Sequence, residues 1–280
     1  MTDASTNTVI IGGGIMGAGI AFEALVAGFP VTIVETLEAH CEPARARVEH
    51  YEARARSRGA DLDGYGLLTV TTDMSAALSD ADVVVEAVPE DLAIKQAVFE
   101  RIGAAVNDHA VLASNTSGLP IGVLGAASGR PAQTVGTHFF NPVPAMRLVE
   151  VVRGVDTSPE ILQKALTFCQ ALGKETVEVA DLPGFVTTRL GTLLMAEAVR
   201  VLQEGVASAE HIDTGMRLGY NHPMGPLALA DRIGLDTLLA ILDDMREAYG
   251  DAFRAPPLLR QMVAAGNSGK KSGSGFYTYS

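Results

Sequence analysis

The feature that most constrains this fold is a glycine-rich turn between a short apolar run and a helical pattern. The run Thr8–Ile11 leads directly into Gly12-Gly13-Gly14-Ile15-Met16-Gly17, which has the spacing G-x-G-x-x-G. In that spacing the first glycine permits a tight turn, the second lets a phosphate approach the backbone, and the third lets the next helix pack on the strand. The segment predicts a strand, a turn and a helix that bind a dinucleotide through Gly12, Gly14, Ile15, Met16 and Gly17.

The rest of the first half repeats this alternation of strand and helix. Further strands are predicted at Val31–Val34, Leu68–Thr71, 82–88, 110–114 and 134–138, with helical spacing between them, as at 92–106. Strands that alternate with helices are typical of βαβ units, which build a parallel sheet with helices on both faces. The predicted fold class is therefore α/β, with a Rossmann-type doubly wound sheet.

The second half of the chain has a different pattern. From Gly184 onward the apolar positions follow helical periodicity, and the turn-forming segment Asp181-Leu182-Pro183-Gly184 precedes them. One predicted helical face contains Leu190, Leu193, Leu194, Val201 and Leu202, and another contains Leu235, Leu238, Leu239 and Leu242. We therefore expect an α/β domain over residues 1–183 and a smaller all-α C-terminal domain over residues 184–280.

Composition and charge limit the classes of partner. The chain has 280 residues, of which 48% are hydrophobic, and its formal net charge is −12. That charge gives no support for a nucleic-acid surface. Glycines, Glu23 and Pro30 interrupt the apolar stretch 8–34, and the polar start is unlike a secretory signal, so no membrane span is predicted. We expect a cytoplasmic protein with no metal-type cysteine spacing and no membrane or nucleic-acid partner.

An acidic residue follows the second predicted strand. Glu35 comes directly after Val31–Val34, at about the spacing from the glycine-rich turn where a carboxylate receives the ribose hydroxyls of adenosine. A carboxylate there would repel the 2′-phosphate of NADP. The sequence therefore predicts NAD as the cofactor.

One histidine lies where such a sheet binds its ligands. His138 ends a predicted strand, and Glu150 follows in an apolar stretch. A carboxylate beside an imidazole fixes its tautomer and stabilises the imidazolium, as a proton-accepting histidine requires. The spacing alone does not show that these two side chains meet. Another loop, Ser114-Asn115-Thr116-Ser117, offers polar groups on the same side of the sheet, either for a ligand or as a cap for the next helix.

Several further motifs occur in order along the chain. They are Val85-Glu86-Ala87-Val88-Pro89-Glu90 with Lys95, Ser114-Asn115-Thr116-Ser117, His138-Phe139-Phe140-Asn141-Pro142, Leu148-Val149-Glu150, Pro183-Gly184-Phe185-Val186, Pro223-Met224-Gly225-Pro226 and Gly269-Lys270-Lys271-Ser272-Gly273. With the glycine-rich turn, they resemble the L-3-hydroxyacyl-CoA dehydrogenases, especially the bacterial 3-hydroxybutyryl-CoA dehydrogenases. The resemblance covers nearly the whole chain.

The resemblance implies a reversible, NAD-linked oxidation of a short L-3-hydroxyacyl-CoA in fatty acid metabolism. It assigns His138 as the catalytic base, Glu150 as its partner, and Ser117 and Asn141 as residues that hold the reacting oxygen and order the nicotinamide end. It also implies that Glu90 and Lys95 contact the ribose and nicotinamide side of the cofactor. The helical domain would bind substrate and form a homodimer.

Two departures from the family pattern concern the substrate. Thr188 stands where the family has an asparagine near the thioester carbonyl, and the region 37–64 looks shorter than in many relatives. Five arginines there could meet CoA phosphates, or they could form a solvated helix with interleaved glutamates: Arg45, Arg47, Arg54, Arg56 and Arg58. The same chemistry on a carrier-protein-bound or free polar 3-hydroxyacid is therefore an alternative.

The fold is also compatible with two other functions. Hydroxyacid dehydrogenases that use a lysine of the second domain as acid and base are disfavoured, because no lysine lies between Lys174 and Lys270. A non-catalytic NAD-binding protein is compatible with the fold alone. The joint presence of His138, Glu150, Ser117 and Asn141 argues against it.

Overall fold

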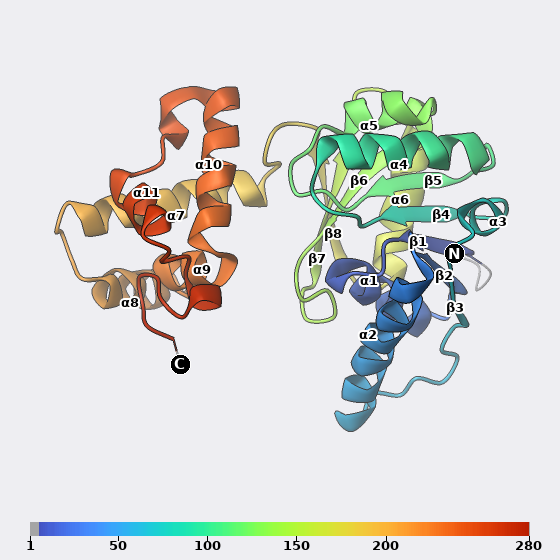
Figure 1. Cartoon of the computed structure of the whole chain (residues 1–280), viewed down its shortest axis with the longest axis horizontal. Coiled ribbons are helices and arrows are strands. Elements are labelled where there is room, and N and C mark those ends of the chain that lie inside the picture. Colours follow the sequence, from blue (N-terminus) through green and yellow to red (C-terminus); the bar gives the residue numbers. More distant parts are fainter. Residues whose placement is uncertain (1–5, 280) are drawn as a thin grey trace. The chain divides into compact units, whose positions relative to one another are not determined.

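An eight-stranded sheet forms the centre of the first of two units in the computed structural model, which describes residues 6–279. The polar first residues, 1–5, and residue 280 lie outside the described part. The first unit ends at Phe185 and the second begins at Val186 (Figure 1). The strand order is β3-β2-β1-β4-β5-β6-β7-β8.

The first six of the eight strands follow the predicted runs closely. They are β1 (Thr8–Ile11), β2 (Val31–Val34), β3 (Leu68–Thr71), β4 (Val83–Glu86), β5 (Val111–Ser114), β6 (Thr134–Phe139), β7 (Leu148–Arg153) and β8 (Glu175–Ala180). The first six are parallel where they pair, while β7 runs antiparallel to β6 and parallel to β8. The doubly wound α/β prediction is confirmed, with a mixed rather than wholly parallel sheet.

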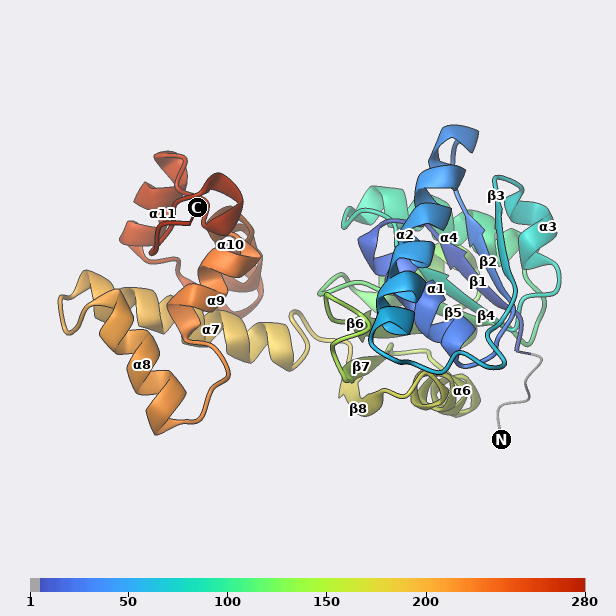
Figure 2. The ribbon, with the colours of Figure 1, turned by 90° about the horizontal axis from the view of Figure 1, so that it is seen from below.

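Helices cover both faces of this sheet. They are α1 (Ile15–Val26), α2 (Glu38–Ser57), α3 (Met74–Leu78), α4 (Leu92–Ala105), α5 (Ile121–Ser128) and α6 (Pro159–Ala171). Figure 2 shows α2 alongside α1, with which it makes extensive contact. Of the α2 side chains, Ala44 and Val48 are buried, so this helix is largely solvent-exposed, as its charged sequence predicts.

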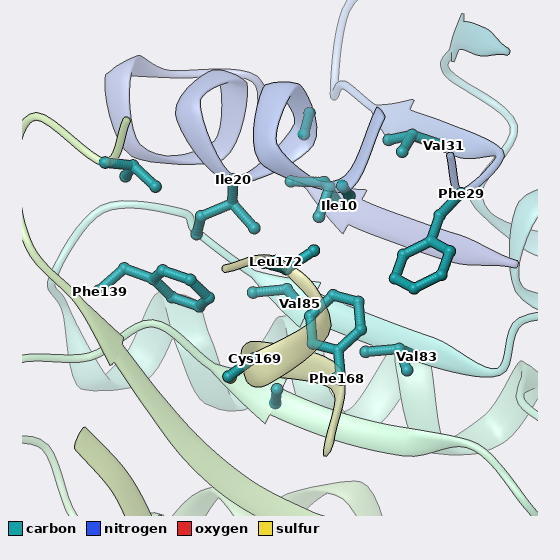
Figure 3. Close-up of a cluster of buried hydrophobic side chains, with 14 of the residues drawn as sticks. Ile10, Ile20, Phe29, Val31, Val83, Val85, Phe139, Phe168, Cys169 and Leu172 are labelled. Atoms are coloured by element: carbon teal, nitrogen blue, oxygen red, sulfur yellow. The ribbon is translucent and has the colours of Figure 1, made fainter. Parts of the chain in front are cut away.

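Alternate side chains of the central strands β1 and β4 enter different cores. Ile10 and Val85 face the core that α1, α2 and α6 cover, and Figure 3 shows Ile20, Phe168 and Leu172 in that same cluster. Val9 and Val84, one residue earlier in each strand, face the core under α3, α4 and α5. This is the period of two expected when a sheet is buried on both sides, and it explains why these strands are apolar throughout.

The second unit is helical. It contains α7 (Thr187–Gln203), α8 (Ala209–Gly219), α9 (Pro226–Ile233), α10 (Leu235–Tyr249) and α11 (Pro257–Ala264). Its core includes Leu235, Leu238 and Leu242, all fully buried, as their spacing predicts. The predicted face of α7 is only partly correct: Leu190 is 62% exposed, and the buried positions of this helix include Met195 and Val199.

The last described residues complete this helical unit. Asp231, which is fully buried, accepts hydrogen bonds from the backbone N–H groups of Phe276 and Tyr277 and from the hydroxyl of Tyr279. A buried carboxylate needs such donors to offset its desolvation. Among the helices of residues 6–279, none is long and apolar enough to cross a membrane.

Candidate active site

The glycine-rich turn has the geometry that phosphate binding requires. Gly12 has φ +97°, a conformation that side chains rarely permit, and a Cβ built at Gly17 would lie 1.8 Å from the carbonyl oxygen of Gly12. A Cβ built at Gly14 meets nothing within 4 Å, so this glycine faces open space. Gly14 is also the N-cap residue of α1, so no side chain caps this helix, and its first turn holds no acidic residue. The N-terminal N–H groups of α1 therefore suit an anion such as a pyrophosphate.

A cavity of about 690 Å³ opens beside this turn. Gly12, Gly14, Ile15, Met16 and Glu35 line it, so five of the predicted cofactor residues are brought together. Oε1 of Glu35 accepts a hydrogen bond from the backbone N–H of Gly13 at 2.8 Å, which ties the carboxylate to the turn. Cavity size, open glycine and positioned carboxylate together fit a dinucleotide without a 2′-phosphate.

Two helical faces also line this cavity, and the sequence singled out only Arg47 among them, as a candidate contact of CoA phosphates. They comprise His40, Pro43 and Arg47 of α2, and Ile94, Val98 and Arg101 of α4. Each trio is spaced by three and four residues, so each forms one helical face, and that spacing is the signal that could have revealed them. Arg47 donates to the carbonyl oxygen of Gly13 at 3.2 Å. This arginine therefore faces the cavity at the glycine-rich turn.

A second cluster lies at the far end of β6. His138 and Glu150 occupy paired positions of the antiparallel strands β6 and β7. Nδ1 of His138 and Oε2 of Glu150 are hydrogen-bonded at 2.7 Å, and the Glu150 side chain is fully buried. The imidazole is 9% exposed, with the ring of Phe140 centred 4.3 Å away. The structure thus brings together the two side chains that sequence spacing could not connect.

The loop after β5 is held by Glu90. Oε1 of Glu90 accepts hydrogen bonds from the hydroxyl of Thr116 at 2.6 Å, the N–H of Ser117 at 2.9 Å and the hydroxyl of Ser117 at 3.1 Å. Thr116 also accepts from the N–H of Leu119. The N-cap residue of the next helix, α5, is Pro120, and no side chain caps that helix, so this loop does not cap it.

Lys95 is buried beneath the same loop. Its Nζ lies 2.7 Å from Oε1 of Glu86 and 3.3 Å from Oε2 of Glu90, and the Lys95 side chain is 0% exposed. Oε2 of Glu86 accepts from the hydroxyl of Ser114 at 2.6 Å. Burial acts to raise the pKa of Glu90, but hydrogen bonds from Thr116 and the charge of Lys95 outweigh it and hold that pKa below its usual range.

The remaining predicted residues lie on separate segments. Asn141 is exposed in the connection between β6 and β7, three residues after His138. Thr188 belongs to the second unit, in the first turn of α7. Gly17 supports the turn from α1 and does not line the cavity. Among residues 6–279, no cluster of three or more His, Cys, Asp or Glu side chains could hold a metal ion.

Comparison with known proteins follows the same division of the chain. Residues 7–182 match the profile of the 3-hydroxyacyl-CoA dehydrogenase NAD binding domain. Residues 184–279 match the profile of the 3-hydroxyacyl-CoA dehydrogenase C-terminal domain. The prediction of NAD as cofactor is thereby confirmed.

Individual relatives match along their whole length. A probable 3-hydroxybutyryl-CoA dehydrogenase of Deinococcus radiodurans is 44% identical over 275 residues, which cover 96% of this chain and 99% of the relative. A 3-hydroxybutyryl-CoA dehydrogenase of Mycobacterium tuberculosis is 43% identical, and the match covers 100% of both chains. The crystal structure of (S)-3-hydroxybutyryl-CoA dehydrogenase from Ralstonia eutropha is 39% identical, with a TM-score of 0.93 over 99% of this chain and 100% of that one.

Proposed function

Because this chain belongs to the 3-hydroxyacyl-CoA dehydrogenase family and is an NAD-dependent enzyme of that type, we propose that it interconverts L-3-hydroxybutyryl-CoA and acetoacetyl-CoA. His138 and Glu150 act as the proton acceptor and donor pair. The observation that carries this proposal is the 2.7 Å hydrogen bond between the His138 ring and a fully buried carboxylate.

The hydrogen bond determines which ring nitrogen can do the chemistry. An ionised carboxylate can only accept hydrogen bonds, so Nδ1 carries a hydrogen and Nε2 of the neutral ring is the basic atom. In the oxidation of the alcohol, Nε2 removes the hydroxyl proton, and Glu150 stabilises the imidazolium that results. In the reduction of the ketone, the same imidazolium returns the proton to the oxygen.

The loop after β5 and the loop after β6 position the reacting groups. In this structure the Ser117 hydroxyl donates to Glu90, which fixes its position in the loop that faces the reacting groups. Asn141 offers both a donor and an acceptor for the reacting oxygen and the nicotinamide end. The buried Lys95 helps to position the loop that carries Ser117, because its charge favours the ionised form of Glu90.

The cofactor cavity supplies the other half of the site. Gly12, Gly14, Ile15, Met16 and Gly17 form and support the pyrophosphate cradle, and Glu35 receives the adenosine ribose hydroxyls. When bound, the cofactor would supply the hydride chemistry at carbon 3: its oxidised form would be the acceptor for the alcohol, and its reduced form the donor for the ketone. The protein itself contributes position and proton transfer.

The second unit, residues 184–280 in our division of the chain, binds the acyl-CoA and mediates a homodimer. Thr188 would donate one hydrogen bond near the thioester.

Leu190, Val206 and Leu218 are each more than 60% exposed, and such exposed apolar side chains favour a protein interface. Sedimentation of the parent enzyme and of a Leu190→Glu variant tests the dimer, because the charge should shift the equilibrium toward the monomer.

The experiment that tests the reaction measures NADH consumption with acetoacetyl-CoA, acetoacetate and an acetoacetyl carrier-protein mimic. We expect rapid turnover of acetoacetyl-CoA alone. In the His138→Gln variant, turnover should fall about 10²–10⁴-fold, because general acid–base catalysis is lost, while NADH affinity is unchanged.

Each of the other outcomes has a definite meaning. Near-normal turnover by a folded His138→Gln variant would remove His138 from the mechanism. Turnover of acetoacetate or of the carrier-protein mimic, with none of acetoacetyl-CoA, would keep the proton chemistry and change the substrate. NADH binding without turnover of any of the three would contradict the short-chain assignment.

A further inference from the structure

A buried lysine outside the proposed catalytic set joins three segments of the first unit. Lys174 lies between α6 and β8, and its side chain is 5% exposed. Its Nζ lies 2.9 Å from Oε2 of Glu23 on α1 and donates to the carbonyl oxygen of Val143 at 2.8 Å. Burying an ammonium group is costly unless its partners are well placed, so this arrangement needs a reason.

Val143 belongs to the loop that carries Asn141. Within residues 141–147, Val143 is the one buried position, with an exposed fraction of 1%. The N–H groups of Ala145 and Met146 donate to the carbonyl oxygen of Pro142 within the loop, and the far end is tied to β8, where the N–H of Glu175 donates to the carbonyl oxygen of Arg147 at 2.7 Å. The placement of the part that carries Asn141 therefore depends on how Val143 is held.

Helix α1 is shaped to receive Val143. A Cβ built at Gly19 would lie 2.9 Å from the Cβ of Val143 and 3.0 Å from its Cγ2, so a glycine is needed for this close approach. The side chain of Val143 thus packs against α1, while Lys174 holds the carbonyl of the same residue. Two independent contacts fix one residue of the loop.

We propose that Lys174 is a positioning residue for the reaction, which holds the Asn141 loop against helix α1. Asn141 lies two residues from Val143, so a shift of the Val143 carbonyl is transmitted to the Asn141 side chain. Glu23 neutralises the buried ammonium and aims it at that carbonyl. This inference rests on the proposed function, because it acts through the role given there to Asn141.

The test separates the hydrogen bond from Lys174 to Val143 from the ion pair between Lys174 and Glu23. The variant Lys174→Met with Glu23→Gln removes the hydrogen bond to Val143 and leaves no uncompensated charge. Because a misplacement of about 1 Å can cost about 10²-fold in rate, we expect kcat for acetoacetyl-CoA reduction to fall about 10–100-fold. The Kd for NADH should stay unchanged. Glu23→Gln alone keeps an acceptor for Lys174 but leaves its charge uncompensated, so kcat should fall less than in the double substitution.

A matched control and a double-mutant cycle identify the route of the effect. Lys164→Met removes an exposed lysine of α6 that pairs with Glu160 in the preceding turn and donates to the carbonyl oxygen of His109, and it should leave kcat unchanged. In an Asn141→Ala background, the double substitution at Lys174 and Glu23 should cause little further loss of kcat, because the residue it positions is gone. A general loss of stability would instead give additive effects.

The outcomes distinguish this inference from the proposed function. Full kcat in Asn141→Ala would refute the role of Asn141, and this inference with it. A loss in Asn141→Ala, combined with full kcat or an additive loss in the Lys174 variant, would refute this inference alone. If the double substitution does not fold, Gly19→Ala displaces Val143 from the opposite side. That variant must then lower kcat in an Asn141-dependent way.

Discussion

The hydrogen bond between His138 and Glu150 gives a quantitative prediction for the substitution Glu150→Gln. Glutamine has nearly the shape of glutamate, so the buried site stays filled and the antiparallel pairing of β6 and β7 is kept. The amide can donate as well as accept, and it carries no charge. The variant therefore loses both the control of the His138 tautomer and the stabilisation of its protonated form.

The size of the effect follows from the geometry. The two atoms are 2.7 Å apart, and the carboxylate is fully buried. Two unit charges about 4 Å apart interact by about 4 kcal/mol at the effective dielectric constant of about 20 that describes protein sites. Since about 1.4 kcal/mol changes a rate tenfold, the loss of this interaction in the transition state should lower kcat about 10³-fold.

The assay is the initial rate of NADH oxidation with acetoacetyl-CoA, with NADH affinity measured separately by fluorescence. Glu178→Gln is the matched control, because Glu178 lies on the neighbouring strand β8, is exposed and pairs with Arg153. We expect the control to keep full kcat. A Glu150→Gln enzyme that is folded, binds NADH normally and turns over within about threefold of the parent would refute the reasoning, because the electrostatic loss should be about 10³-fold.

Three further predictions concern the cofactor, the substrate and acid stability. Glu35→Ala should weaken NADH binding about tenfold, because hydrogen bonds to a charged group are lost, and should reduce the preference for NADH over NADPH. Titration with both cofactors checks this, and an unchanged preference for NADH would contradict it. Thr188→Asn should raise kcat/KM for acetoacetyl-CoA several-fold, by restoring the longer side chain of the family; a decrease would indicate a pocket suited to another acyl group. The pKa of Glu90 is lowered from 4.5, so its ionisation stabilises the fold above that pH, and this contribution is lost as the pH falls through the lowered value. Urea unfolding should therefore show Glu90→Gln to be less stable than the parent near neutral pH, by about 1 kcal/mol, with the gap closing in acid; a gap that stays constant would refute this assignment.

Local patterns were sufficient to predict most of the first unit. Thr8–Ile11, Val31–Val34 and Leu68–Thr71 are strands with the predicted bounds, because each is a short β-branched run between turn-forming residues. The antiparallel strand β7 was not predicted from Leu148–Arg153. Four of its six residues are buried in succession, so it lacks the alternation that identifies a strand exposed on one side.

The contacts inside the site depend on register and burial, which local patterns do not specify. His138 and Glu150 meet because an antiparallel connection places them opposite each other, and a slip of one residue would turn Glu150 to the other face. Lys95 was expected to contact the cofactor, and its complete burial between Glu86 and Glu90 could not be anticipated for a charged residue. The Lys174–Glu23 pair joins residues far apart in the chain, which no local spacing reveals.

The dependence of Asp231 on the last described residues has a consequence for the order in which the chain matures on the ribosome. The sheet of the first unit is complete once Ala180 has been synthesised, so this unit can fold while the helical half is still emerging. Asp231, by contrast, must wait for the N–H groups of Phe276 and Tyr277 and the hydroxyl of Tyr279. We therefore expect nascent chains stalled before Phe276 to carry a protease-resistant first unit and a protease-sensitive second one.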